Sequence, residues 1–159
     1  MNADHTPEER AAAALDASGV SYRTVTHGPV RSLAEAAVAR GVEVPDVVKT
    51  IVVRRADDDY VLVLVPGDRT ISWPKLRALL GVKRLSMPDA ETARAVTGYE
   101  RGTITPFGTL TPLPVFADQR IAGREVALGA GGHGVAVIVS ADEAIAALGA
   151  QVADVTEPE

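Results

Sequence analysis

The feature that most constrains the fold is a pair of apolar, β-branched runs separated by three acidic residues. Residues 47–53 read VVKTIVV, residues 60–65 read YVLVLV, and Asp57, Asp58 and Asp59 stand between them. Two such runs that flank a polar turn predict an antiparallel β-hairpin. Because the apolar character is nearly continuous instead of alternating, we expect both faces of the hairpin to be covered and the hairpin to lie centrally in its sheet.

Short helices are predicted around this hairpin by their start and stop signals. Capping residues, some with a glutamate three positions later, mark the starts. The expected helices begin after Thr6, Ser32, Ser72, Ser86 and Ser140. A glycine ends four of them, and the one after Ser86 runs to about residue 96. Strands are expected at 21–26, 115–117, 125–128 and 135–139.

The stretch from 97 to 114 has no periodicity and is rich in glycine and proline. An irregular segment of this length in a compact domain is usually functional or disordered. Its apolar residues, Tyr99, Ile104, Phe107 and Leu110, favour an ordered and functional loop. Together the elements predict an α+β fold. We expect one domain over residues 1–159, with a mostly antiparallel or mixed sheet flanked by short helices.

Composition excludes several classes of protein. The chain has 159 residues, 47% hydrophobic and 23% charged, a globular balance that excludes a disordered protein. No apolar run approaches the roughly 20 residues of a membrane-spanning helix, and the polar start is unlike a secretory signal, so we expect a cytoplasmic protein without membrane contact. The net charge of −5 and the 4% aromatic content speak against extended duplex nucleic-acid binding and against a base-stacking surface.

Lys49 is the most informative single residue, because it interrupts the apolar run of the first predicted hairpin strand. A buried, unpaired ammonium is costly, so the side chain must reach solvent, a carboxylate or a ligand. One interpretation is a lysine that extends to the rim of the sheet. The other is a cation that lines a pocket for a phosphate or carboxylate.

Two glycine-rich segments are candidates for ligand contact. Residues 129–134, GAGGHG, match GxGxxG, but a strand follows them instead of a helix, so a dinucleotide site is excluded. They remain either a plain hairpin loop or a turn that brings backbone N–H groups to a ligand. His133 within them is either exposed or a pocket residue. Residues 98–108, GYERGTITPFG, either connect two elements or present amides to a carbonyl or oxyanion.

Metal and nucleophile chemistry have little support in the sequence. Cysteine is absent, the three histidines are scattered, and neither HExxH nor GxSxG occurs. We therefore expect no metal and no cofactor.

Three motifs in order give the chain a family resemblance. They are Val48-Lys49-Thr50, the segment Gly102-Thr103-Ile104-Thr105-Pro106 extended by Gly108, and Gly131 with Gly134 before a strand. With these motifs, residues 8–156 resemble the YbaK/prolyl-tRNA editing superfamily, the free-standing relatives of the insertion domain of bacterial prolyl-tRNA synthetases. Weaker matches are Tyr22, His27 and the strand 115–118, which ends in Asp118.

The resemblance implies a deacylase that hydrolyses the ester of a misacylated tRNA, such as alanyl- or cysteinyl-tRNA for proline. It implies catalytic roles for Lys49, Gly102 and Pro106: the lysine holds the tRNA 3′ end or orients the ester, and the loop amides bind the oxyanion. The substrate-binding residues that it implies are Tyr22, His27, Thr103, Ile104, Thr105, Gly108, Asp118, Gly131 and His133. Gly129 and His133 depart from the serine- and arginine-containing turn of cysteinyl-specific members, so neither amino acid is favoured.

The implied partners are the acceptor end of a mischarged tRNA and an aminoacyl-tRNA synthetase. Two other classes of function remain open. The same pocket could bind an aminoacyl-nucleotide without turnover, as an adaptor of a synthetase. A pure interaction protein would use its sheet edge, but it would leave Lys49 and both glycine-rich segments without a role.

Overall fold

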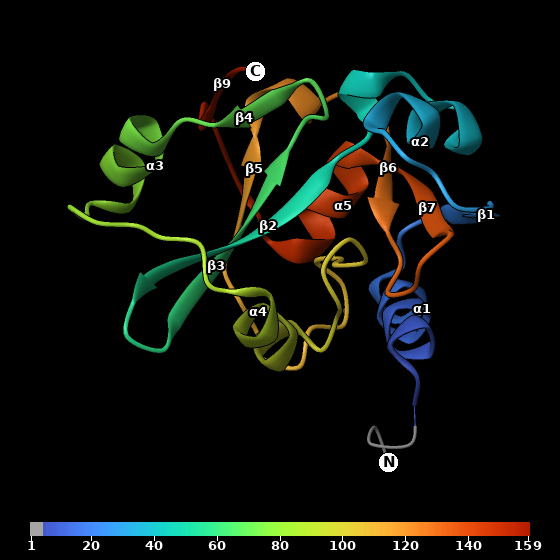
Figure 1. Cartoon of the computed structure of the whole chain (residues 1–159), viewed down its shortest axis with the longest axis horizontal. Coiled ribbons are helices and arrows are strands. Elements are labelled where there is room, and N and C mark those ends of the chain that lie inside the picture. Colours follow the sequence, from blue (N-terminus) through green and yellow to red (C-terminus); the bar gives the residue numbers. More distant parts are fainter. Residues whose placement is uncertain (1–4) are drawn as a thin grey trace.

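Two larger β-sheets lie side by side in the computed structural model, which describes residues 5–159 (Figure 1), and a third sheet consists of two short strands. The first sheet is antiparallel, in the order β1-β7-β6, and the second is mixed, in the order β2-β3-β5-β8. Their strands are β1 (Tyr22–Thr26), β7 (Val135–Ser140), β6 (Glu125–Gly129), β2 (Lys49–Ala56), β3 (Asp59–Val65), β5 (Val115–Asp118) and β8 (Gln151–Ala153). The sheets meet where the Val48 N–H donates to the Ala127 carbonyl at 3.0 Å.

The predicted hairpin is confirmed as β2 and β3, which pair antiparallel from Lys49 opposite Val65 onward. Its predicted central position is wrong for β2, because β5 pairs in parallel with β3 and leaves β2 at the edge of its sheet. Both faces of the hairpin are nevertheless covered: Val52 and Val53 are buried in two separate core clusters. A continuous apolar run thus predicts that both faces of a strand are buried. It does not predict whether both edges of the strand pair with neighbouring strands.

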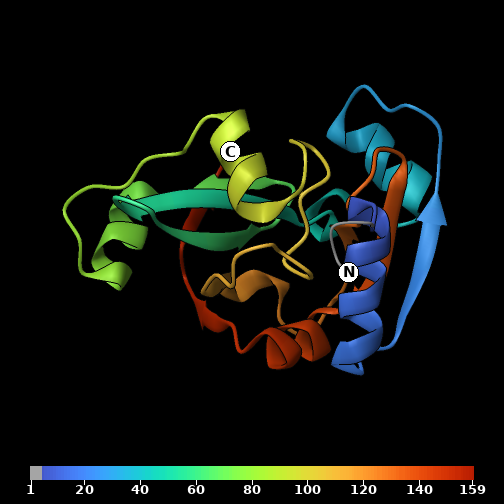
Figure 2. The same ribbon diagram turned by 90° about the horizontal axis from the view of Figure 1, so that it is seen from below.

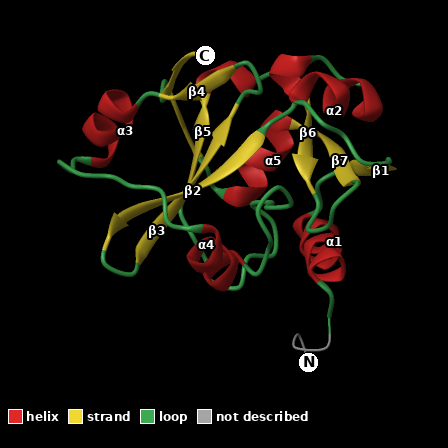
Figure 3. Cartoon of the chain, viewed as in Figure 1, coloured by secondary structure: helices red, strands yellow, loops and turns green. Residues whose placement is uncertain are grey.

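The five predicted helices are present (Figure 3), and each begins at a polar cap. The predicted start of the fourth after Ser86 is wrong by three residues, because the backbone of Ser86 pairs with Arg54 and the helix begins after Asp89. They are α1 (Pro7–Ser18), α2 (Leu33–Arg40), α3 (Trp73–Leu80), α4 (Ala90–Thr97) and α5 (Ala141–Leu148). The cap side chains of Thr6, Ser32, Ser72, Asp89 and Ser140 each accept a hydrogen bond from an N–H of the first turn. No helix within residues 5–159 combines the length and the apolar character needed to cross a bilayer.

Three short strands and two 3₁₀ turns carry no recognisable sequence pattern and were not predicted. They are β4 (Arg69–Ile71), β8, β9 (Thr156–Pro158), η2 (Val44–Asp46) and η3 (Gln119–Ile121). Strand β9 pairs antiparallel with β4, so the last described residues lie against the segment that follows the hairpin. Three-residue strands are too short for alternation to show in the sequence.

The irregular segment between α4 and β5 is held by contacts to the first helix and to the β6–β7 turn (Figure 2). The Arg10 Nε donates to the Gly108 carbonyl at 2.8 Å, and the Gly131 N–H donates to the Thr103 carbonyl at 3.0 Å. The buried Tyr99 hydroxyl donates to the Phe107 carbonyl at 2.6 Å. The prediction of an ordered irregular loop is confirmed, and the α+β class with a mixed sheet is confirmed with it.

Candidate functional site

A cavity of about 790 Å³ opens beside strand β2, between helices α2 and α4. Figure 1 shows β2 running between these helices. Apolar side chains from all three elements form most of its wall, among them Leu33, Val52 and Ala93. The loop residues Gly102 and Ile104 close it on the side of the β6–β7 turn. Its volume lies in the range of roughly 300–1,000 Å³ that is typical of small-molecule sites.

Basic side chains concentrate around this cavity although the chain as a whole is acidic. Arg31, Arg40, Lys49 and Arg101 line it, and Asp89 supplies the only carboxylate among the described lining residues. Cations around a partly apolar cleft focus a positive potential there and attract an anionic ligand. Within residues 5–159, no group of three or more histidines and carboxylates is placed to hold a metal ion.

Arg40 is the most desolvated of these cations. Burial lowers the pKa of its guanidinium, and its Nε lies 3.4 Å from the His27 Nε2. No carboxylate of the described residues forms an ion pair with it. A partly buried guanidinium without a counter-ion is suited to a phosphate or carboxylate ligand, because it offers several N–H donors in one plane.

Lys49 lines the cavity, and its ammonium also has partners inside the fold. The Nζ donates to the Arg69 carbonyl at 2.7 Å and lies 3.7 Å from the Glu159 carboxylate. Its side chain remains 32% exposed. The two interpretations of this lysine are therefore not exclusive, since the residue lines the cavity while its amine donates to the Arg69 carbonyl.

Thr50, the next residue, has its hydroxyl on the opposite face of β2, because successive side chains alternate. Its neighbours on that face, Val48 and Val52, pack in the core cluster that also contains Leu128. The Oγ1 atom is buried and has no hydrogen-bond partner among residues 5–159, although Thr50 lines the cavity. Buried polar atoms in folded proteins are nearly always paired, so this one requires an explanation.

Residues of the loop 102–106 differ in which side they face: some line the cavity and the others are buried in the core. Gly102 and Ile104 line the cavity, whereas Thr103, Thr105 and Pro106 are buried. The Thr103 hydroxyl donates to the Glu100 carbonyl at 2.7 Å, and the Thr105 hydroxyl accepts from the Phe107 N–H at 3.2 Å. Neither the Gly102 nor the Ile104 N–H donates a hydrogen bond to another described residue.

The glycine-rich turn between β6 and β7 packs against this loop. Gly131 has a φ of +87°, and a Cβ there would lie 2.7 Å from the Pro7 carbonyl oxygen, so only glycine fits without a shift. His133 is exposed, and its Nε2 lies 3.3 Å from the Glu100 carboxylate. The two glycine-rich segments, separate in the sequence, therefore meet at one side of the cavity.

Comparison with known proteins agrees with this arrangement. The model of the aminoacyl-tRNA editing domain matches residues 27–147, which is more than half of the chain. The chain belongs to this family. A solved structure described as a candidate trans-editing enzyme for prolyl-tRNA synthetase superposes with a TM-score of 0.86 at 30% identity. The superposition covers 96% of this chain and 98% of the other.

Proline–tRNA ligases are also similar to this editing domain over part of its length. The ligase of Thermosipho melanesiensis is 36% identical over 100 residues, which is 62% of this chain and 17% of the ligase. That of Heliobacterium modesticaldum is 41% identical over 76 residues, 48% of this chain and 13% of the ligase. The chain thus spans less than a fifth of the length of these relatives.

Several residues that the resemblance nominated lie away from the cavity of this editing domain. The Tyr22 hydroxyl donates to Asp16 and so joins β1 to α1, a hydrogen bond that raises the pKa of Tyr22. Gly108 is engaged by Arg10, and His27 touches the cavity only through Arg40. The positions of these residues do not test whether they bind substrate, so their substrate-binding roles stay predictions.

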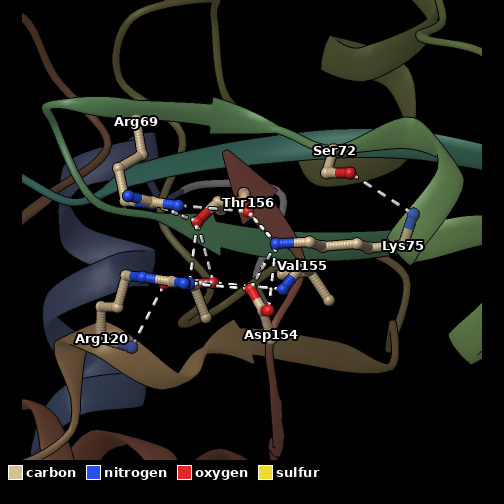
Figure 4. A network of polar contacts seen from close by, with 8 residues as sticks. Arg69, Ser72, Lys75, Arg120, Asp154, Val155 and Thr156 are labelled. Carbon is tan, nitrogen blue, oxygen red and sulfur yellow. Dashed lines mark hydrogen bonds and ion pairs between the residues drawn. The ribbon is translucent and has the colours of Figure 1, made fainter. Parts of the chain in front are cut away.

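Asp118 belongs to a separate polar network at the ends of β5 and β8. Figure 4 labels Arg120, Asp154 and Thr156 of this network. Its carboxylate is fully buried and accepts hydrogen bonds from the Val155 N–H at 3.2 Å and the Thr156 hydroxyl at 3.0 Å. Arg120 pairs with it at 3.1 Å. The Arg69 Nε donates to the same Thr156 hydroxyl at 2.7 Å, so this network is joined to Lys49 through the Arg69 carbonyl.

Sequence reasoning missed Arg31, Arg40, Arg101 and the hydroxyl of Thr50 as residues of the cavity. Arg31 and Arg40 lie at the two ends of α2 and Arg101 lies in the loop after α4, and no local pattern brings such residues together. Thr50 could have been found, because alternation along the predicted strand places it on one face with Val48 and Val52.

Proposed function

We propose that this chain is a trans-acting deacylase that hydrolyses the ester of a misacylated tRNA, with alanyl- or cysteinyl-tRNA for proline as its substrates. The observation that carries the proposal is the cation-lined cavity that the Lys49–Thr50 strand and the 102–104 loop form together. The relatives of this chain include a solved structure described as a candidate trans-editing enzyme for prolyl-tRNA synthetase and several proline–tRNA ligases, which supports tRNA as the partner.

The phosphates and the amino-acid side chain of the substrate would bind different parts of the cavity. Arg31, Arg40 and Arg101 would contact the terminal phosphates of the acceptor end, and the apolar wall would hold a small amino-acid side chain. A synthetase cannot exclude a smaller amino acid from a larger pocket by sterics alone, so a second hydrolytic site is required. Contacts limited to the acceptor end also suit a chain with a net charge of −5.

In the proposed reaction, water adds to the ester carbonyl carbon and the bond to the terminal ribose oxygen breaks. The leaving ribose oxygen takes one proton of the water and becomes a hydroxyl, the other proton passes to solvent, and the amino acid leaves as its carboxylate. The Gly102 and Ile104 N–H groups, which have no acceptor among the described residues, would stabilise the oxyanion. Lys49 would orient the 3′ end, and His133 at the edge of the loop would contribute to selectivity.

Deacylation of alanyl-, cysteinyl-, seryl- and threonyl-tRNA, on proline and cognate tRNAs, tests the proposal. We expect the wild type to accelerate the loss of one ester and Lys49→Ala to reduce kcat/KM by about 10- to 100-fold, the value of a lost charge-assisted contact. Lys83→Ala is the matched control, because Lys83 is exposed and does not line the cavity. Binding of aminoacyl-tRNA without acceleration of any ester would instead establish a non-catalytic binding module.

A further inference from the structure

The hydroxyl of Thr50 is a buried polar group for which the folded chain supplies no partner. Its Oγ1 has no hydrogen bond among residues 5–159, while Val48 and Val52, its neighbours on the same face, are buried in the core. Burying a hydroxyl without a partner destabilises a fold, and valine has the same shape and a higher preference for strands. Stability alone would therefore favour valine at this position.

The other buried threonine hydroxyls show that such pairing is available within this fold. Thr97 donates to the Ala93 carbonyl at 2.8 Å, Thr103 to the Glu100 carbonyl at 2.7 Å, and Thr156 to Asp118 at 3.0 Å. Thr50 differs from them in one further respect, since it lines the cavity. The unpaired hydroxyl and the ligand site thus coincide.

The position of Thr50 in the cavity indicates which part of a substrate it would meet. It lies on β2 directly after Lys49, and the cavity wall beside it consists of apolar residues such as Val48 and Val52. The guanidinium groups that suit phosphates belong to other segments, at residues 31, 40 and 101. An apolar recess with one hydroxyl fits a small acyl group that carries a polar atom, and does not fit a phosphate.

We infer that the Thr50 hydroxyl is the hydrogen-bonding partner of the aminoacyl group, either of its α-amine or of its ester oxygen. The inference rests on the proposed deacylase function and adds the residue that holds the scissile acyl end. Because the Oγ1 atom is covered, the contact requires rotation about the Cα–Cβ bond, one of the staggered changes open to a threonine. No proton is transferred by Thr50 in this role, and the covalent steps are those given above.

Thr50→Val tests the inference, because it removes the hydroxyl and keeps the shape. We expect kcat/KM for the preferred aminoacyl-tRNA to fall by about tenfold, while the melting temperature stays equal or rises by a few degrees. Thr50→Ser keeps a hydroxyl and should recover most of the activity. Thr24→Val is the matched control: Thr24 is an exposed strand residue outside the cavity, and both readouts should stay at the wild-type values.

A propionyl-tRNA, which lacks the α-amine, separates the two possible partners. If Thr50→Val slows only the aminoacyl ester, the partner is the amine; if it slows both esters equally, the partner is the ester group. If the wild type is active and Thr50→Val hydrolyses both esters at the wild-type rate, the inference is overturned and the proposed function is unaffected. A wild type that accelerates no ester overturns the proposed function, and the inference with it.

Discussion

Two polar clusters of this editing domain differ in how completely their groups are paired. In the network at the ends of β5 and β8, Arg120 pairs with both Asp118 and Asp154, and the Thr156 hydroxyl donates to Asp118. Figure 4 shows the Arg120–Asp154 pair beside Thr156. In the cavity beside β2, by contrast, cations outnumber carboxylates and the Thr50 hydroxyl has no partner within the described chain. Full pairing indicates a structural role, and incomplete pairing indicates groups that await a ligand.

Lys49 lies at the junction of the two clusters. Its ammonium binds the carbonyl of Arg69, whose guanidinium belongs to the network, while the lysine itself lines the cavity. The network therefore fixes the position of a cation in the site without occupying the site. Substitutions within the network should change stability, and substitutions within the cavity should change activity.

The largest effect is expected for Asp118→Ala, which breaks the network at its buried centre. The substitution leaves the Val155 N–H, the Thr156 hydroxyl and one side of Arg120 without their acceptor. Since each buried group left unpaired costs about 1–3 kcal/mol, the free energy of unfolding should fall by about 3 kcal/mol or more. Urea denaturation measures it, with Asp57→Ala in the exposed hairpin turn as the control. A loss below about 1 kcal/mol would contradict a structural role.

A smaller effect, and on function alone, is expected for Arg40→Gln in the cavity. If Arg40 binds a phosphate of the acceptor end, the slope of log affinity against log salt concentration should decrease by about 0.7, and affinity at low salt should fall by about tenfold. Filter binding of the tRNA at several salt concentrations measures both. Arg77→Gln on α3, outside the cavity, is the control. An unchanged salt slope would remove Arg40 from the phosphate contacts.

The sequence predicted local structure better than it predicted the site. Capped helices and long apolar strands follow from neighbours in the chain, and the loop at 98–114 was recognisable from its glycines and prolines. Strand β9, by contrast, forms only because residues 156–158 reach β4 across the fold. The edge position of β2 likewise depends on β5, more than 50 residues further along the chain.

The same distinction between local and distant information applies to the cavity. Lys49 and Gly102 were nominated from motifs, and both line it. Arg31 and Arg40 could not be nominated, because their convergence depends on how α2 packs beside β2. The family resemblance nominated Asp118 as a substrate contact, and that role stays a prediction; in the structure its carboxylate pairs with Val155, Thr156 and Arg120.

The smallest effect is expected from the outer part of the network, at acidic pH. Hydrogen bonds from Arg120 and then Lys75 lower the pKa of Asp154 from 3.8 to about 2. A carboxyl whose pKa is lower in the folded state stabilises the fold above its unfolded pKa, and this stabilisation disappears as the pH falls from about 4 through about 2. Asp154→Asn should therefore flatten the pH dependence of the urea midpoint in this window.

The size of this effect is limited because Asp154 lies near the surface, where solvent screens the ion pairs. Asp58→Asn in the exposed hairpin turn should leave the acid limb of the stability profile as in the wild type. Deacylation per folded molecule should be the same for Asp154→Asn and the wild type at neutral pH, since Asp154 does not line the cavity. If Asp154→Asn instead lowered activity without lowering stability, the network would influence the cavity through Lys75, Thr156 and Arg69. The two clusters would then be functionally coupled.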